Sequence, residues 1–194
     1  AALRSAADDV ARLVQGVLDF AQAEGAPVAR FPAPFHLEAA VRVAAAPHVT
    51  EASRRGLGFA IEIGPEAGEL FVGDGAHVQK LADLMVDYAV KNTEQGAVTV
   101  RISQLERVGV RAMFVLSVDV DGACFSAAAA RYAAGERDAL ELTITEAIAG
   151  AMGGALEVVV AEGQGGAVRV RFPLDMPMDE LTERRLAGRL FAGG

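Results

Sequence analysis

The sequence has 194 residues, of which 52% are hydrophobic, enough for one domain of ordinary size plus a small appendage. Its formal net charge of -8 argues against nucleic-acid binding, which needs clustered Lys and Arg. The single cysteine, Cys124, excludes an internal disulfide framework and suits the cytoplasm. The sequence contains no apolar run of about 18 residues, so we expect no membrane span. It has no signal peptide and does not begin with Met, so we expect a fragment of a longer protein.

The N-terminal part predicts one long helix followed by a stiff connector. Apolar residues recur at three- and four-residue steps over residues 3–23, which is typical of an amphipathic helix. Gly25 and Pro27 end this helix, and the proline-rich residues 31–35 form the connector. A second helix is expected over about 37–55, interrupted or kinked near Pro47.

The middle of the chain alternates between strand and helix patterns. Residues 57–63 alternate apolar and polar side chains and predict a half-buried strand. Asp74 occupies an N-cap position before a helix that carries Val78, Leu81, Met85 and Tyr88 on one face. Two strands follow at 97–103 and 111–120.

The last third predicts one helix and a hairpin. Residues 126–134 are rich in Ala and fit more than one structure, whereas 138–152 predict a helix that Gly153 and Gly154 end. Strands are expected at 155–161 and 167–172, on either side of the glycine-rich turn 163–166. This order of elements predicts an α+β fold, a two-layer sandwich with helices on one face of a sheet.

The stretch from Gln79 to Gly96 resembles the N-box of bacterial sensor histidine kinases, which usually reads like QVLLNLLSNAIKFTEQG. Four further segments are similar to that family in the same order. They are 17–25 (the LLDFSKIEAG end of the second dimerisation helix), 34–37 (the PFDL entry to the catalytic domain), 54–57 with 73–75 (REKGL and GDP), and 152–158 (MGGxIxV after the last glycine box).

The resemblance implies the two-layer α/β sandwich of the histidine kinase ATPase (Bergerat, or GHKL) type, which gyrase and MutL share, preceded by a helical dimerisation segment. We therefore expect a dimerisation-helix segment at 1–26, an ATPase-like domain at 27–175 and a C-terminal linker or tail at 176–194. In the family, helices of two subunits form a four-helix bundle, so a homodimer through residues 3–23 is expected.

The family's ATP-binding boxes are altered in this sequence. The resemblance places degenerate ATP-site positions at Asp87, Tyr88, Lys91, Asp121 and Gly122. Tyr88 replaces the Asn that holds magnesium, and its ring is expected to plug the pocket or join the core. Alignment on Gly122 puts Val120 in place of the Asp that accepts the adenine amino group. Asp119 or Asp121 would substitute only with a shifted register, because neighbours on a strand point to opposite faces.

The phosphate-binding part of the family site is changed as well. The second glycine box corresponds to residues 137–142, which contain no glycine but include Asp138, an expected helix N-cap, and Glu141. The lid is shortened to about fourteen residues between Cys124 and Ala139. Lys91 alone keeps a phosphate-facing position in the N-box, unless it is a solvated lysine at the helix end.

The histidines give no further chemistry. No histidine precedes residue 24, so the family's phospho-accepting His-box is missing, and His36, His48 and His77 are expected at the surface. Three scattered histidines and one cysteine offer no metal-ligand spacing, and no catalytic residue is assigned.

The resulting functional hypothesis is a degenerate histidine kinase core, a pseudokinase that serves two-component signalling as a regulatory or protein-interaction module with weak or no ATP binding. An active but divergent kinase core that binds ATP and magnesium remains the first alternative. A histidine phosphotransfer protein with a kinase-like second domain is the other. Expected partners are a response regulator or another kinase, in the cytoplasm. The sequence indicates neither the signal nor the cognate regulator.

Overall fold

The computed structural model describes residues 32–121, 123–134, 139–161 and 165–177. The elements in chain order are β1 (Ala33–His36), α2 (Leu37–Arg54), β2 (Gly58–Ile63), the 3-10 helix η1 (Pro65–Gly68), β3 (Leu70–Gly73), α3 (Gly75–Lys91), β4 (Ala97–Val108), β5 (Arg111–Asp121), α4 (Ala123–Ala133), α5 (Leu140–Ala151), β6 (Ala155–Ala161) and β7 (Gly165–Asp175).

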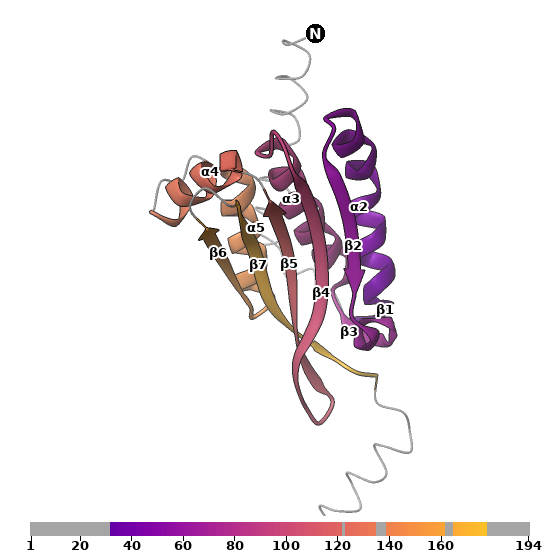
Figure 1. Cartoon of the computed structure of the whole chain (residues 1–194). Helices are drawn as coiled ribbons and strands as arrows, with labels where there is room; N and C mark the ends of the chain where they lie inside the picture. Colours follow the sequence, from indigo (N-terminus) through magenta and orange to yellow (C-terminus); the bar gives the residue numbers. More distant parts are fainter. Residues whose placement is uncertain (1–31, 122, 135–138, 162–164, 178–194) are drawn as a thin grey trace, which may run out of the picture.

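The strands form one mixed sheet of seven strands in the order β1-β3-β7-β5-β4-β2, with β6 also paired to β7. Strands β2 and β4 are parallel, and the remaining pairs are antiparallel. The helices lie together on one side of this sheet (Figure 1). The predicted α+β, two-layer fold is therefore confirmed.

The two faces of the sheet differ in chemistry because side chains alternate along each strand. On β4, Val98, Val100 and Ile102 are buried against the helices, whereas Arg101 between them is exposed. The same alternation on β5 and β7 buries Leu116 and other apolar side chains on the helix side. The opposite side of the sheet, which we call the open face, carries charged residues.

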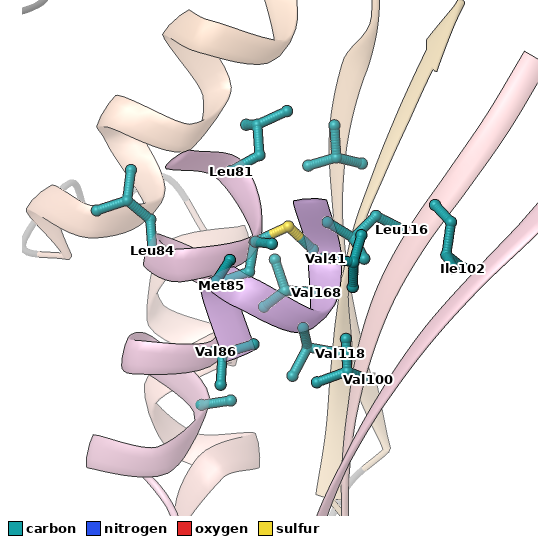
Figure 2. Close-up of a cluster of buried hydrophobic side chains, with 14 of the residues drawn as sticks. Val41, Leu81, Leu84, Met85, Val86, Val100, Ile102, Leu116, Val118 and Val168 are labelled. Carbon is teal, nitrogen blue, oxygen red and sulfur yellow. The ribbon is translucent and has the colours of Figure 1, made fainter. Parts of the chain in front are cut away.

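The core fills the space between the sheet and helices α2 and α3. Figure 2 shows Leu81 and Met85 of α3 and Val41 of α2 in one buried cluster with Leu116 and Val168 of the sheet. All five side chains are fully buried. Complete burial of one such side chain stabilises the fold by about 1.5–3 kcal/mol, so this layer of contacts fixes α3 on the sheet.

Helix α3 has partners for its terminal backbone groups, which every helix leaves without intrahelical bonds. At its start, the backbone N–H of His77 donates to the Asp74 carboxylate at 3.0 Å, as the predicted N-cap requires. At its end, the side chains of Asn92 and Thr93 donate to the carbonyls of residues 88 and 89. The Arg55 guanidinium donates to the Val90 carbonyl. The helix that carries the N-box resemblance is thus held at both ends.

Several predicted boundaries need correction. The second helix runs without interruption through Pro47. Strand β4 extends five residues beyond the predicted 97–103, past an irregularity in pairing between Gln104 and Glu106. The Ala-rich stretch forms α4, and the N-cap residue of α5 is Ala139 rather than Asp138. Strands β1 and β3 were not predicted at all.

The predicted helix over 3–23 and the tail beyond 177 lie outside the described residues. Of the helices that are described, none combines the length and the apolar character needed to cross a membrane.

Candidate functional site

Tyr88 lies in the interior on the sheet side of α3, with 3% of its surface exposed. Its ring packs edge-to-face against the fully buried Phe125 of α4, with the ring centroids 5.8 Å apart and the planes at 73°. This is a preferred geometry for an aromatic pair. The two rings therefore bring α3 into contact with α4, which lies in the stretch after Cys124 where the family resemblance implies a lid.

The end of β5 places the candidate adenine-site residues on opposite faces. Val120 is 5% exposed and belongs to the core on the helix side. Asp119 lies on the open face, where its carboxylate accepts hydrogen bonds from Arg101 at 2.7 Å and from Ser117 at 2.9 Å. Asp121, two residues further along, is exposed and shares the face of Asp119. Gly122 lies outside the described residues.

Asp87 and Lys91 occupy successive turns of α3 and form an ion pair. The Lys91 ammonium lies 2.7 Å from the Asp87 carboxylate and 3.7 Å from the carboxylate of Glu141. Glu141 is in the first turn of α5, the position at which the family resemblance implies glycines. The fold thus brings together one ammonium and two carboxylates, a contact across α3 and α5 that sequence reasoning did not predict.

His48 is a residue that the sequence reasoning misplaced. It was expected at the surface, but it is 8% exposed on the side of α2 that packs against α3. Its Nε2 lies 2.9 Å from the Asp83 carboxylate and its Nδ1 3.9 Å from that of Asp87. The spacing of the two aspartates puts them on one helix face, but nothing in the sequence identifies the helix that packs there.

The surroundings of Asp83 shift its pKa. Partial burial raises the pKa of this carboxyl, but the hydrogen bond with His48 and the charge of Lys80 outweigh burial, so the pKa lies below its ordinary value of 3.8. Of the other two histidines, His36 is exposed and His77 pairs with Asp74 at 2.8 Å. In the part of the chain that the structure describes, no group of three His, Cys, Asp or Glu side chains is arranged to hold a metal ion.

The comparisons with solved structures identify the class of fold. Full-length ShkA, solved in complex with AMPPNP, matches with a TM-score of 0.70 and 26% identity over 92% of this chain and 38% of its own. The histidine kinase AdeS of Acinetobacter baumannii matches with a TM-score of 0.66 and 13% identity over 91% of this chain and 83% of its own. The catalytic domain of the histidine kinase ThkA matches with a TM-score of 0.54 and 15% identity over 73% of this chain and 95% of its own.

These likenesses show that the chain has the α+β fold of histidine kinase catalytic domains. No protein-family model matches the chain. No curated protein matches it either. The chain spans little more than a third of the length of ShkA, namely 38%.

Proposed function

We propose that this chain is the degenerate core of a histidine kinase, which acts in two-component signal transduction as a regulatory or protein-interaction module with weak or no ATP binding. The observation that carries the proposal is the buried contact between Tyr88 and Phe125. By the family resemblance, Tyr88 stands where an Asn amide holds magnesium. A phenol ring packed in the interior offers no such amide, and it fills space that the metal and the triphosphate need.

Val120 supports the same proposal at the adenine end of the site. Its side chain is buried on the helix side, where the resemblance places the Asp that accepts the adenine amino group. Valine has no acceptor, and a buried amino group without a partner costs about 1–3 kcal/mol. Asp119 does not replace it, because its carboxylate is bonded to Arg101 on the open face.

Lys91 supports the proposal at the phosphate end. Its ammonium contacts Asp87 and lies close to Glu141, so one positive charge faces two carboxylates. A phosphate at this position would have to compete with Asp87 for the ammonium and would approach the negative charge of Glu141. Both effects weaken anion binding at the start of α5, where a helix N-terminus would otherwise favour it.

One observation favours the alternative of an active, divergent kinase core. The Asp87 side chain is 20% exposed beside Lys91, and a carboxylate is a ligand that Mg²⁺ prefers. In that alternative, ATP and magnesium bind through Asp87 and Lys91. The third possibility, a phosphotransfer protein, requires a phospho-accepting histidine upstream of the sequence given.

Titration calorimetry with magnesium and AMPPNP tests the proposal. Three lost interactions of about 1.4 kcal/mol each weaken binding about a thousandfold, so we expect a dissociation constant of roughly millimolar or higher. A low micromolar constant would overturn the proposal and support the active kinase. In that case, Asp87→Asn and Lys91→Ala should each weaken binding at least about tenfold, whereas Arg42→Ala on α2 should not.

The proposed partners are a response regulator or another kinase of a two-component pathway, and the proposed location is the cytoplasm. We further propose that residues 3–23 mediate a homodimer, with residues 1–26, 27–175 and 176–194 as dimerisation helix, ATPase-like domain and tail. Neither ATP nor magnesium has a role in this proposal. A purified receiver domain should therefore bind the dimer equally well with and without nucleotide.

A further inference from the structure

The outer edge of strand β2 is open to a further strand. In the strand order β1-β3-β7-β5-β4-β2, β2 is the last strand, and among the described residues only β4 pairs with it. Figure 1 shows β2 at the end of the sheet opposite β6 and α4. A strand that joins β2 would therefore extend the sheet on the side away from α4 and α5, which contribute to the candidate site.

Alternate residues of β2 direct their backbone N–H and C=O groups to this edge. In a parallel pair, one set of alternate residues bonds to the neighbouring strand and the other set points away from it. The backbone N–H of Gly58 donates to the Gly96 carbonyl at 2.9 Å, and that of Gly64 donates to the Ile102 carbonyl at 2.8 Å. The even-numbered residues of β2 thus face β4. The residues whose backbone groups point outward are the odd-numbered ones, Phe59, Ile61 and Ile63.

The edge of β2 lacks the features that usually prevent a further strand from joining a sheet. Its residues pair with β4 in continuous register, without a bulge, and include no proline or lysine. Glu62 is the one charged residue of the strand, and its carboxylate accepts a hydrogen bond from Arg101 of β4 at 2.6 Å, on the side away from the edge. By contrast, β1 at the other end of the strand order has four residues and contains Pro34. The edge of β2 is therefore suited to pairing with another chain.

We propose that β2 pairs with β2 of a second copy of this chain, antiparallel and centred on Ile61. Two-fold symmetry then places Phe59 opposite Ile63 of the second copy. All three positions point their backbone groups to the edge, so each forms a hydrogen-bonded pair with its counterpart. On the helix side the paired side chains are apolar and half-buried, and on the open face Ala60 lies opposite Glu62 of the second copy. In this register the strand is complementary to itself, with no like charges directly opposite.

The backbone groups of β2 favour this register over its neighbours. A centre on Ala60 or on Glu62 would keep only two pairs of outward-facing residues within β2. A centre between two residues would place outward-facing groups opposite residues that already bond to β4. The centre on Ile61 is the one that uses every outward-facing residue of the strand.

The inference does not depend on nucleotide binding and goes beyond the proposed function. It joins the sheets of two copies into one continuous sheet through residues other than 3–23. A dimer through residues 3–23 would have a second two-fold contact in β2, and the two contacts together would link dimers into larger assemblies. The extent of pairing would then depend on the local concentration of the chain.

Disulfide formation in the full chain tests the register. In a Cys124→Ala background, Phe59→Cys, Ile61→Cys and Ile63→Cys are made singly, and the rate of oxidation to a covalent dimer is measured by non-reducing electrophoresis. In the proposed register residue 61 lies opposite itself, with about 5.5 Å between the Cα atoms, which a disulfide can span. Residues 59 and 63 each lie four residues, about 14 Å, from their own copies.

The three positions should therefore react at different rates. Ile61→Cys should form the covalent dimer at least about tenfold faster than either of the other two variants, because only its thiols are held together by the pairing. An equimolar mixture of Phe59→Cys and Ile63→Cys should react faster than either variant alone, since these positions lie opposite each other. Equal rates at the three positions, or a faster reaction at position 59 or 63 alone, would overturn the proposal.

Charge at the exposed position 60 tests the same pairing by a second route. Sedimentation equilibrium is measured in a Leu13→Glu background, which weakens the predicted interface through residues 3–23. Ala60→Glu would face Glu62 of the second copy at two symmetric places, so it should raise the dissociation constant about two- to thirtyfold. Ala60→Lys should lower the constant by a similar factor, although a lysine at an edge usually hinders pairing. Shifts of the same sign in the two variants would overturn the proposed register.

Discussion

At the scale of single residues, α3 presents two groups of side chains with different surroundings. Tyr88 is buried and contacts the ring of Phe125, whereas Asp83, Asp87 and Lys91 are partly exposed and contact charged or polar groups of α2 and α5. The first group couples α3 to α4 by packing. The second group couples α3 to α2 and α5 through polar and charged contacts. Substitutions in the two groups should therefore differ in their dependence on pH.

The aromatic contact should be measurable as a coupling energy. Tyr88→Leu and Phe125→Leu should each lower the free energy of unfolding by about 1–3 kcal/mol, because both rings are buried. The double variant should lose less than the sum by about 0.5–1.5 kcal/mol, the usual value for an edge-to-face pair. Urea unfolding of the four proteins gives this value. As a control, Tyr88→Leu with Phe172→Leu should be additive, since Phe172 contacts the ring of Phe114. A coupling below about 0.3 kcal/mol would contradict the contact.

The pair of His48 and Asp83 should give stability that depends on pH. The pKa of Asp83 is lowered in the fold, so its charged form stabilises the protein above the ordinary value of 3.8, and this contribution is lost as pH falls through the folded pKa. His48→Ala should cost about 1–3 kcal/mol at pH 5, because it removes a buried hydrogen-bonded group.

The difference in unfolding free energy between the wild type and His48→Ala should shrink between pH 5 and pH 3. Val49→Ala, an exposed neighbour on α2, should cost less than about 0.5 kcal/mol at every pH. A cost of His48→Ala that stays constant down to pH 3 would exclude the pairing with Asp83 as its source.

At the scale of elements, the sequence predicted those that have a strong local signal. Asp74 correctly predicted the start of α3, and the glycines after residue 152 correctly predicted the end of α5. There the backbone N–H groups of Gly153 and Gly154 donate to the carbonyls of residues 150 and 149 at 3.0 and 2.8 Å. Gly153 has a φ of 75°, which favours glycine. Local capping chemistry of this kind can be read without the fold.

The elements that escaped prediction depend on distant partners. Strands β1 and β3 have four residues each, too few for an alternating pattern, and β1 exists through its pairing with β3. The contacts of Lys91 with Glu141 and of His48 with Asp83 join residues 50 and 35 positions apart. Such contacts follow from the arrangement of the helices, so the sequence indicated the candidate site but not its ion pairs.

Two glycines near the end of α5 should respond in opposite ways to substitution by alanine. A Cβ at Gly154 would lie 1.9 Å from the Arg171 carbonyl oxygen, so Gly154→Ala must displace β6 from β7. We expect a loss of at least about 1–3 kcal/mol. A Cβ at Gly150 meets nothing within 4 Å inside a helix, so Gly150→Ala should add about 0.5–1 kcal/mol. Thermal unfolding compares the two variants directly, and a tolerated Gly154→Ala would contradict the close approach of the backbones.

At the scale of the whole molecule, the two faces of the sheet differ in the residues that they carry and in what covers them. The described helices cover one face with an apolar core, and the other face presents Arg101, Asp119 and their charged neighbours. Two further stretches of the chain have amphipathic or mixed character: residues 3–23, with an apolar stripe, and residues 178–194. An apolar stripe of this length is stabilised by burial against another helix. Its predicted partner is the same helix of a second copy.

Charge introduced into this stripe should dissociate the predicted dimer. Leu13→Glu or Val17→Glu would bury a carboxylate in a helical interface, which costs several kcal/mol, so each should raise the dimer dissociation constant at least about tenfold. Arg12→Glu is the matched control, because residue 12 lies on the opposite side of the predicted helix and should leave the constant within about twofold. Sedimentation equilibrium over a range of concentrations measures the wild type and the three variants, with thermal unfolding of the α+β domain as a check on folding. A wild-type monomer at high concentration, or equal effects of Leu13→Glu and Arg12→Glu, would contradict an interface through residues 3–23.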